Sequence, residues 1–345
     1  MIRFVVADDL TGAADSAVHL GVAGKVRITY PPAAAWSDSV GSGMVQVRDT
    51  ETRSLPDSQA ARTVGECCEA LVRAFGPDSR VFKKVDSTLR GAVEPELLAA
   101  GEALRRRLVL LAPSLPAQGR TVVRGRLLVD GQDRGPVLEG AEVVDARGLS
   151  SGGLEGCRGP LVVADAVSDA DLDLIAAAIE DRGEILPAGS AGLAAAIARR
   201  RRRVAPDAPP LPRPAVVVAV GTRHPLARGH LAAIRQGFPE LAVFDLLDEP
   251  EGDENALAAR LASRSATELR ALPPGSAIIA TGGDTALAVC RELGAGALRP
   301  GGELLPGVVW NQLEGSDTML VTKAGGFGPP DVLLAAVRLL LANPK

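Results

Sequence analysis

Residues 4–20 read FVVADDLTGAADSAVHL, and this run contains the unit from which most of the chain is built. An apolar strand leads into two adjacent acids, a small polar turn and an amphipathic helix. Strands that are apolar throughout and alternate with helices are typical of parallel sheets covered on both faces. Ligands bind such sheets at the carboxyl ends of the strands. Asp8 and Asp9 are therefore expected in a binding site, since a buried strand has no packing use for them.

The same pattern of strand, small-residue turn and helix recurs along the chain. It is found at residues 81–104, 185–198, 216–236, 277–293 and 319–341. The pattern predicts an α/β fold of two domains, each a largely parallel sheet flanked by helices, with the active site in the interdomain cleft.

The clearest break in this pattern is the stretch RRRRRVAPDAPPLPRP, residues 199–214. We predict an N-terminal domain at residues 1–205, a Pro-rich linker at 206–214 and a C-terminal domain at 215–345. The arginine run is interpreted as a solvated helix end, which the helix dipole favours, in preference to an anion or nucleic-acid patch.

Composition argues against several classes of function. A net charge of −4 and an aromatic content of 3% disfavour a nucleic-acid binder, and no apolar run is long enough to span a bilayer. Four cysteines without metal-binding spacing fit a reducing compartment, and Asp8 follows Met1 too closely for a secretory signal. We expect a cytoplasmic protein without a nucleic-acid or membrane partner. The sequence does not fix the oligomeric state, and a homodimer is one state considered.

Three strand-to-helix turns in the predicted C-terminal domain suit phosphate. They are Gly282-Gly283-Asp284-Thr285, the glycine-rich Lys323–Gly328, and Gly221-Thr222-Arg223-His224-Pro225. Glycines let a backbone approach a ligand closely, and a helix start offers N–H groups to an anion. For the first turn we expect the helix to begin at Ala286, with Asp284 or Thr285 as its cap. Each turn has an ordinary structural explanation, but three at one sheet edge indicate a polyphosphate nucleotide.

The familiar nucleotide-binding signatures do not occur in the sequence. It contains no Walker A motif, no dinucleotide G-x-G-x-x-G after a strand and no protein-kinase set. A nucleotide site would therefore belong to another fold, and a dehydrogenase is the weaker hypothesis.

The densest polar cluster of the predicted N-terminal domain is KKVDSTLRG, residues 83–91. A plain structural explanation is a helix start capped by Asp86 or Ser87, which leaves the paired lysines and Arg90 unexplained. Arg53 and Arg120 follow other strands, and these arginines are expected to converge on a small anionic substrate, because guanidinium binds carboxylate in a bidentate way. Asp9 or Asp86 can accept a hydroxyl proton or position Mg²⁺.

The histidines add little to this assignment. His19 is expected to pack within a helix, and His230 is expected on a helix surface.

Taken together, several ordered motifs resemble the four-carbon acid sugar kinase family, which includes 3-oxo-tetronate, D-threonate and D-erythronate kinases. The motifs are ADDLTGA at 7–13, TETR at 50–53, KKVDSTLRG at 83–91, APSLPAQGR at 112–120, GGDTA at 282–286 and KAGGFG at 323–328. The resemblance implies a kinase that uses ATP and Mg²⁺ to phosphorylate the terminal hydroxyl of a four-carbon sugar acid, giving a 4-phosphate.

The resemblance also implies roles for individual residues. The catalytic candidates are Asp9 and Asp86, with Asp9 favoured as the base because a flexible turn follows it. The substrate-binding candidates are Asp8, Thr11, Arg53, Lys84, Ser87, Arg90 and Arg120. The ATP-binding candidates are Thr222, His224, Gly282, Gly283, Asp284, Thr285, Lys323, Gly325 and Gly326. No metal-ligating residue is assigned.

Three residues depart from the family pattern. At the 221 turn the family usually has Gly-Ser-x-Ser, whereas Thr222 and His224 stand here, and Ala14 replaces an amide that could touch the substrate. A sugar-acid or nucleotide binding protein that kept the site and lost the chemistry is therefore the alternative hypothesis.

Overall fold

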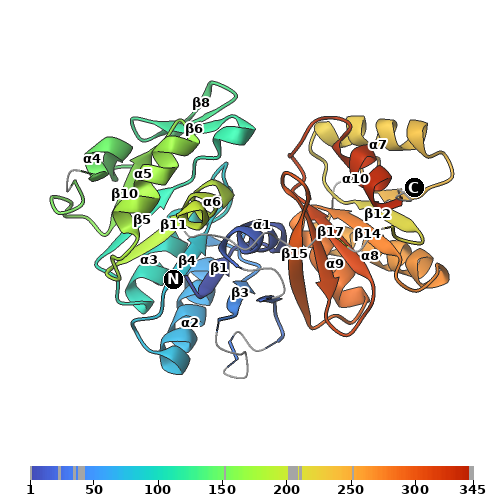
Figure 1. Cartoon of the computed structure of the whole chain (residues 1–345), viewed down its shortest axis with the longest axis horizontal. Coiled ribbons are helices and arrows are strands. Elements are labelled where there is room, and N and C mark those ends of the chain that lie inside the picture. Colours follow the sequence, from blue (N-terminus) through green and yellow to red (C-terminus); the bar gives the residue numbers. More distant parts are fainter. Residues whose placement is uncertain are drawn as a thin grey trace. The chain divides into compact units, whose positions relative to one another are not determined.

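The chain divides into two compact units, which are described separately. A computed structural model describes residues 2–21, 25–33, 36–37, 43–150, 153–200, 209, 212–250 and 252–341. Unit 1 comprises Met1–Lys25 and Thr29–Val204, and unit 2 comprises Val26–Ile28 and Ala205–Lys345 (Figure 1). Most of the predicted linker 206–214 and the arginines at 201–203 lie outside the described residues.

Unit 1 alternates strands and helices along most of its length, as the sequence predicts. Its elements are β1 (Phe4–Ala7), α1 (Leu10–Leu20), β2 (Val26–Thr29, of which only Thr29 groups with this unit), β3 (Val45–Asp49), α2 (Asp57–Phe75), β4 (Val81–Lys84), α3 (Val93–Ala103), β5 (Leu108–Ala112), the 3₁₀ turn η1 (Pro116–Gln118), β6 (Arg120–Val123), β7 (Arg126–Val129), β8 (Gln132–Pro136), β9 (Glu142–Asp145), α4 (Ala146–Ser150), β10 (Leu161–Asp165), α5 (Asp169–Ile179), β11 (Ile185–Gly189) and α6 (Ala191–Arg199).

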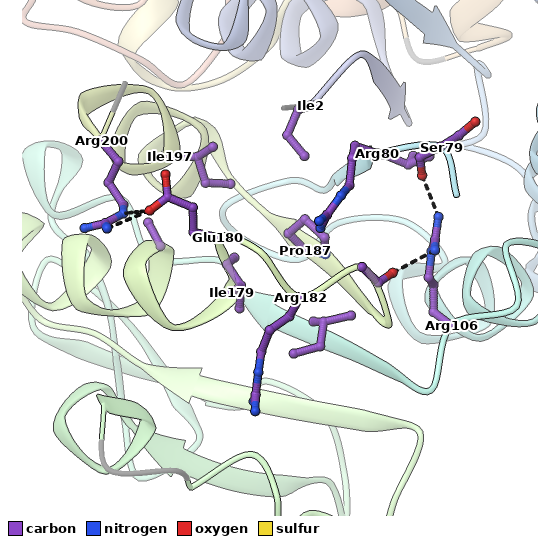
Figure 2. Close-up of a pocket in the computed structure, with 14 residues that line it drawn as sticks. Ile2, Ser79, Arg80, Arg106, Ile179, Glu180, Arg182, Pro187, Ile197 and Arg200 are labelled. Carbon is purple, nitrogen blue, oxygen red and sulfur yellow. Dashed lines mark hydrogen bonds and ion pairs between the residues drawn. The ribbon is translucent and has the colours of Figure 1, made fainter. Parts of the chain in front are cut away.

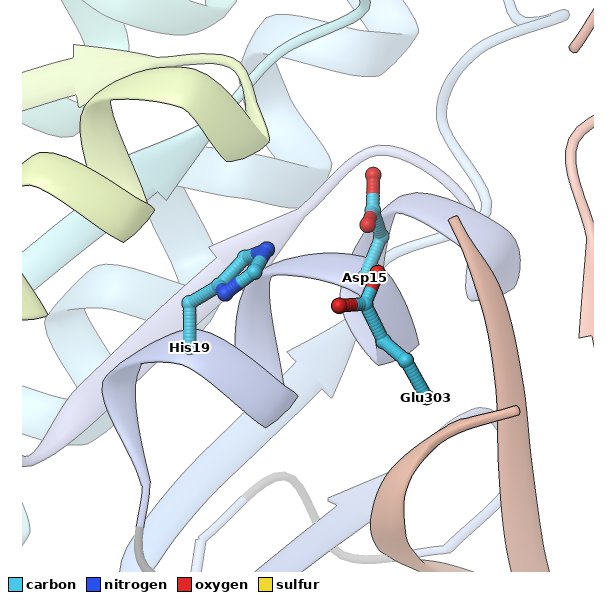
Figure 3. A group of neighbouring side chains, drawn as sticks. All are labelled: Asp15, His19 and Glu303. Atoms are coloured by element: carbon cyan, nitrogen blue, oxygen red, sulfur yellow. The ribbon is translucent and has the colours of Figure 1, made fainter. Parts of the chain in front are cut away.

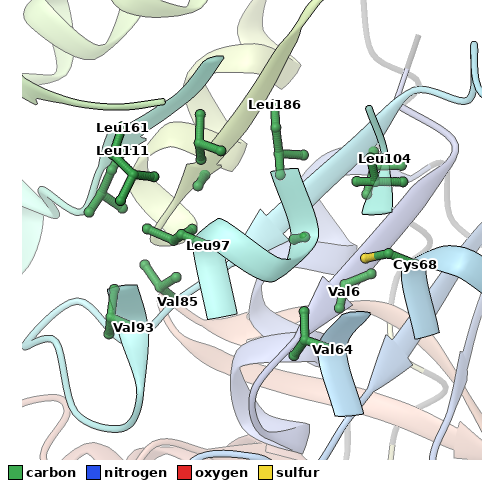
Figure 4. Close-up of a cluster of buried hydrophobic side chains, with 14 of the residues drawn as sticks. Val6, Val64, Cys68, Val85, Val93, Leu97, Leu104, Leu111, Leu161 and Leu186 are labelled. Carbon is green, nitrogen blue, oxygen red and sulfur yellow. The ribbon is translucent and has the colours of Figure 1, made fainter. Parts of the chain in front are cut away.

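The main sheet of unit 1 is parallel. Its strands are hydrogen-bonded in the order β3-β1-β4-β11-β5-β10-β9, and each neighbouring pair in this order is parallel. Helices α2 and α3 pack against each other, and their apolar side chains meet the strands in one core cluster. Figure 4 shows Val64 and Cys68 of α2 and Leu97 of α3 turned toward Val6 and Leu186 of the sheet. Burying the apolar stripe of each helix in this way provides most of its stability.

A small antiparallel sheet was not predicted. Strands β6, β7 and β8 form it, in that order. Two-residue turns join them, and both residues of each turn have positive φ: 52° and 70° at Arg124-Gly125, 51° and 76° at Asp130-Gly131. That conformation matches the right-handed twist of a hairpin. Arg120 is the first residue of β6 and so lies in this hairpin sheet.

Unit 2 has the same alternation, followed by a hairpin. Its elements are β12 (Val216–Val220), α7 (Leu226–Gly237), β13 (Ala242–Asp245), α8 (Glu254–Ala271), β14 (Ala277–Thr281), α9 (Gly283–Glu292), β15 (Ala297–Leu305), β16 (Val308–Leu313), β17 (Met319–Lys323) and α10 (Val332–Leu341).

The strands of unit 2 run in the order β13-β12-β14-β17-β16-β15. The first four are parallel, and β16 joins β17 and β15 in antiparallel fashion. The apolar faces of α7 and α10 share one core cluster with Val216, Val218 and Val220, whereas Ala219 on the other face meets α8. Alternate strand residues thus point to helices on both sides, as expected for a doubly covered sheet.

These features confirm the predicted fold class of two units with largely parallel sheets flanked by helices. That the active site lies in a cleft between the domains stays a prediction. In the part of the chain that the structure describes, none of the helices is both long and apolar enough to cross a bilayer.

Candidate functional site

The acids of the opening stretch lie at the carboxyl edge of the unit 1 sheet. Strand β1 pairs with β3 and β4 so that Ala7 is opposite both Asp49 and Lys84. The residues that follow these three strands therefore meet at one edge. This register brings Asp8 and Asp9 beside the turn of Arg53 and the cluster that begins at Lys83.

Asp9 caps helix α1. Its Oδ1 accepts a hydrogen bond from the Gly12 N–H at 2.8 Å, and its Oδ2 accepts one from the Thr11 hydroxyl at 2.6 Å. A Cβ at position 12 would lie 2.6 Å from Asp9 Oδ1 and 2.7 Å from Lys84 Nζ. Gly12 therefore lets the acid and the lysine approach the helix start together. The predicted site residues Asp9, Thr11 and Lys84 meet here.

Arg53 bridges the acids of two strands. Its Nε lies 2.8 Å from Asp8 Oδ2, its Nη1 2.6 Å from Asp9 Oδ2 and its Nη2 3.8 Å from Asp86 Oδ1. Burial alone would raise the pKa of Asp8, but the nearby charges of Arg53 and Lys84 outweigh it and hold that pKa below its usual range. Asp8 is therefore a carboxylate at neutral pH.

Asp86 anchors its own turn. Its Oδ2 accepts hydrogen bonds from the Thr88 hydroxyl and from the Arg90 Nε at 3.1 Å, and its Oδ1 accepts one from the Arg90 Nη2 at 2.8 Å. Burial opposes ionisation, but the hydrogen bond from Arg90 and the charge of Arg53 hold the pKa of Asp86 well below its usual range. The expectation that Asp86 or Ser87 caps a helix is wrong, because α3 begins only at Val93 with Ala92 before it.

The two lysines of the cluster do different things. Successive side chains of a strand point to opposite faces, and Lys83 therefore turns away from Lys84. Lys83 Nζ lies 2.7 Å from Glu96 Oε2 of α3, and both side chains are buried. This ion pair gives Lys83 a structural role. Lys84 donates to the Val85 carbonyl at 2.7 Å and stays beside the acids.

Some buried polar atoms at this edge have no hydrogen-bond partner among the described residues. They are Oδ1 of Asp8, Oδ2 of Asp49 and Nε of Arg120. A buried donor or acceptor without a partner costs about 1–3 kcal/mol, so each of these atoms is a candidate for contact with a ligand. Burial lowers the pKa of Arg120 while the charge of Asp86 raises it, which places Arg120 near the acids as predicted.

Sequence reasoning missed two acids. Asp49 ends β3, and burial raises its pKa well above the usual range, aided by the charge of Asp9. Asp15 lies on α1, one turn before His19 (Figure 3). Burial raises the pKa of Asp15 to about 6, against the charge of Lys84. The sequence feature that could have identified Asp15 is its position as the one carboxylate in a helix of mostly small and apolar residues.

The three phosphate-suited turns of unit 2 lie side by side. Strands β12, β14 and β17 are neighbours, with Val220 opposite Thr281 and Thr281 opposite Lys323. Helix α9 begins at Gly283, with Gly282 before it at φ 94° and no side-chain cap. The expectation that this helix begins at Ala286 is therefore wrong. Asp284 and Thr285 lie in its first turn, where the N–H groups have no partner within a helix.

Glycines allow these turns to interlock. A Cβ at Gly221 would lie 1.6 Å from Thr285 Oγ1, and one at Gly325 would lie 2.3 Å from Thr222 Oγ1. A Cβ at Gly326 would lie 2.9 Å from the His224 ring. The predicted nucleotide residues thus contact one another. His230 is buried rather than on the surface, and its Nε2 lies 3.0 Å from the carbonyl oxygen of Pro329, the residue that follows the glycine-rich Lys323–Gly328 turn.

Lys323 is buried at the end of β17. Its Nζ donates to the carbonyl oxygens of Ala324 at 2.8 Å and Gly325 at 3.3 Å. Burial lowers the pKa of Lys323 to about 7. Near pH 7 this lysine is therefore only about half protonated, and an anionic ligand beside it would favour the charged form.

Comparisons with known proteins identify two family models that match this chain. A family model described as a sugar-binding N-terminal domain matches residues 3–140, and one described as a nucleotide-binding C-terminal domain matches residues 240–333. A D-threonate kinase of Bordetella bronchiseptica is 33% identical over 97% of this chain and 96% of its own length. A 3-oxo-tetronate kinase of Cupriavidus necator is 28% identical over 97% of this chain and 96% of its own length.

Among solved structures, a Salmonella typhimurium protein described as a putative tRNA synthase has a TM-score of 0.72. It is 22% identical over 97% of this chain and 98% of its own, and this likeness shows the fold alone. The paired α/β units, their two polar strand edges and the kinase relatives define a sugar-acid kinase, an enzyme whose substrates are a nucleotide and a small molecule. The chain belongs to the four-carbon acid sugar kinase family.

Proposed function

We propose that this enzyme transfers the γ-phosphoryl group of ATP to the terminal hydroxyl of a tetronate or 3-oxo-tetronate, giving the 4-phosphate. The observation that carries the proposal is the buried Oδ1 of Asp8, which has no hydrogen-bond partner in the described part of the chain, while Arg53 holds the other oxygen. Such an atom suits the hydroxyl of a polyol acid. The names of the relatives in both kinase groups support the same class of substrate.

In unit 1 the cations recognise the carboxylate of the acid and the anions recognise its hydroxyls. Arg90 and Arg120 are the guanidinium groups proposed for the carboxylate, because a planar fork matches it in a bidentate way. Asp8 accepts from a substrate hydroxyl, and Lys84 balances the charge of the acids. Thr11 and Ser87 provide hydroxyl groups at the same edge.

Asp9 is the proposed proton acceptor, in preference to Asp86. The low pKa of Asp86 and its bonds to Arg90 and Thr88 suit an anchor better than a base. Phosphoryl transfer depends mainly on positioning and charge neutralisation, so the demand on the base is modest. The contact of Asp9 with Arg53 is then what keeps it oriented.

In unit 2 the three turns are the proposed ATP site. Thr222, His224, Gly282, Gly283, Asp284, Thr285, Lys323, Gly325 and Gly326 form it. The donors fit a polyphosphate, because the start of α9 and the buried Lys323 bring N–H groups and a cation to one edge. Mg²⁺ would neutralise charge on the phosphates, and Asp284 offers the hard oxygen ligand that this ion prefers.

The proposal extends to assembly and location. A Bordetella bronchiseptica structure described as a domain-swapped dimer has a TM-score of 0.50 and is 29% identical over 97% of each chain, and we propose a homodimer on this basis. Because the reaction consumes ATP, we place it in the cytoplasm.

A coupled ADP-release assay tests the reaction. With ATP and Mg²⁺ we expect turnover on at least one of D-threonate, D-erythronate and 3-oxo-tetronate, and none when the terminal hydroxyl is absent. Thermal stabilisation by an acid without ADP release would favour the binding-protein alternative. Nicotinamide turnover followed by absorbance would favour a dehydrogenase.

A further inference from the structure

A pocket of unit 1 lies near the starts of β4 and β11, at the edge of the sheet opposite to the acids (Figure 2). Its volume is about 30 Å³, which suits water and is too small for a substrate. Arg106, which lines it, donates to the carbonyl oxygens of Gly183 and Ser79 and so joins two loops of the protein. A buried polar atom without a partner is a better indication of a ligand, and unit 2 has one at the edge proposed for ATP.

This atom is the hydroxyl oxygen of Thr281, the last residue of β14. The residue is 1% exposed, and its Oγ1 has no hydrogen-bond partner among the residues that the structure describes. A threonine hydroxyl can donate one hydrogen bond and accept two. Burying it without a partner costs free energy, and valine would fill nearly the same space without that cost. The hydroxyl therefore requires an explanation that packing does not provide.

The strand order of unit 2 places Thr281 where ligands bind in open α/β sheets. Strand β12 lies between β13 and β14. The helices that follow β12 and β13 cover opposite faces, since α7 shares a core cluster with Val218 and α8 meets Ala219. The chain therefore reverses its direction across the sheet between β12 and β14, and ligands bind beyond the carboxyl ends of the strands at such a point. Thr281 borders it, opposite Val220 at the end of β12.

Thr281 lies on the same face of the sheet as Lys323. Strands β14 and β17 are parallel, and Thr281 is opposite Lys323 in their register. Ile279 and Val321, two residues earlier on each strand, belong to the core cluster of α7 and α10. Alternate residues of a strand point the same way, so Thr281 and Lys323 point to this face as well. A neutral donor and an ammonium group are thus neighbours at one strand edge.

The backbone that follows Thr281 suits an anion. Gly282 has a φ of 94°, and a Cβ built there would lie 3.9 Å from Thr222 N and from Thr285 Oγ1, with nothing closer. Helix α9 begins at Gly283 with no side-chain cap, and the first N–H groups of a helix have no partner within it. Such N–H groups attract phosphate. Thr281 adds a hydroxyl donor directly before them in the chain.

We propose that the Thr281 hydroxyl donates a hydrogen bond to a phosphate oxygen of the bound nucleotide. This role rests on the ATP site proposed for unit 2 and adds to it a residue that the sequence motifs do not include. The phosphate oxygen accepts the hydroxyl proton, for which the described residues provide no acceptor, and Lys323 on the same face balances the charge. A buried water beside the hydroxyl is the competing explanation, and it predicts a loss of stability, without a loss of nucleotide affinity, when the hydroxyl is removed.

Calorimetry with ADP, in the presence and in the absence of Mg²⁺, tests this role in Thr281→Val. We expect ADP to bind more weakly by about tenfold or more in both conditions, because a hydrogen bond to a charged group contributes about that factor. The KM for ATP should rise in parallel, and the KM for the sugar acid should not change. Thr281→Ser keeps a hydroxyl and should bind ADP within about threefold of the parent. The melting temperature of ligand-free Thr281→Val should equal or exceed that of the parent, because an unpaired buried hydroxyl has been removed.

Thr322 on the neighbouring strand β17 provides the matched control. Its Oγ1 accepts from Asn311 Nδ2 at 3.2 Å and lies 3.4 Å from the Val309 carbonyl oxygen, so this buried hydroxyl has partners in the protein. Thr322→Val should lower the melting temperature and leave ADP affinity unchanged.

Three results would overturn the role of Thr281. They are an unchanged ADP affinity in Thr281→Val, a loss of affinity seen only with Mg²⁺, and a melting temperature lowered as much as in Thr322→Val. The first would leave the hydroxyl without a ligand, the second would assign it to the metal, and the third would make it structural. Absence of both ADP binding and ATP turnover in the parent chain would instead contradict the proposed function on which this role rests.

Discussion

Arg53 forms an ion pair with the buried Asp8, with 2.8 Å between Nε and Oδ2, and this pair leaves the other oxygen of Asp8 without a partner among the described residues. The same guanidinium reaches Asp9. One cation thus fixes two adjacent acids and leaves one acceptor open. This arrangement explains how a strand end can bury two carboxylates and still offer one to a ligand.

Replacing Arg53 by Gln is expected to lower kcat/KM at least a hundredfold and to destabilise unit 1 by about 3–5 kcal/mol, because two buried acids lose their cation. The folded pKa of Asp8 is depressed, so its contribution to stability is present above its unfolded pKa, near 4, and is lost as pH falls. The stability difference between parent and variant should therefore shrink below about pH 4. Denaturant melts across pH measure it. Arg73→Gln, which breaks an exposed pair with Glu69, is the control and should change stability little.

Asp9→Asn is expected to lower kcat roughly 10²–10⁴-fold while nucleotide binding persists. The amide oxygen can still accept from the Gly12 N–H, so the helix cap is retained. Asp86→Asn should mainly raise the KM for the sugar acid, because it loosens Arg90. Steady-state kinetics and nucleotide calorimetry on both variants distinguish them. Retained kcat in Asp9→Asn would move the role of base to Asp86.

Lys83 and Lys84 are neighbours with opposite expected effects. Lys83→Met leaves Glu96 buried without its cation and should cost about 3–5 kcal/mol of stability, with kcat preserved at a temperature where the variant is folded. Lys84→Met should lower the stability less than Lys83→Met does, and it should lower kcat/KM strongly. Melting curves and ADP release, measured on both, test the pair. The double variant Lys83→Met/Glu96→Leu should recover most of the lost stability, and failure to do so would contradict the ion-pair explanation.

The strand-to-helix units were predictable because their signals are local. An apolar run followed by small residues and a helix is visible at Phe4–Leu20, and register then places all such turns at one sheet edge. The hairpins of β6–β8 were not predicted, because turns such as Arg124-Gly125 do not interrupt a regular pattern of apolar residues that would mark the end of a strand. Arg124 has a positive φ, and an arginine in a sequence does not by itself predict a turn with this conformation.

The site was predicted in outline and not in its pairings. Arg53 and Asp86 were assigned to the acid-binding edge because each follows a strand. The partner of Lys83 was not foreseen, since Glu96 is on the next helix and the alternation of β4 decides which lysine reaches it. The burial of Asp49 depends on neighbouring strands, which a single sequence does not specify.

Gly325→Ala is expected to raise the KM for ATP about tenfold or more with little change in the KM for the sugar acid. A Cβ there would lie 2.3 Å from the Thr222 hydroxyl oxygen and push that side chain out of the turn. Gly296→Ala is the matched control, because a Cβ there meets nothing within 4 Å. Equal effects of Gly325→Ala on both substrates would contradict the assignment of this turn to the nucleotide.

Nucleotide binding is expected to take up a proton at pH 8, because Lys323 has a pKa of about 7 and phosphate charge would raise it. Calorimetry in two buffers of different ionisation enthalpy measures the uptake, and equal heats would contradict it. Because the folded pKa is below the unfolded one, the unfolded chain binds more protons between about pH 7 and 10, and stability rises with pH in that range. Lys323→Met should therefore be more stable than the parent at pH 7, by a few kcal/mol at most, with a gap that closes as pH rises. It should also abolish the proton uptake and weaken ATP binding, whereas the exposed control Lys25→Met should do none of these.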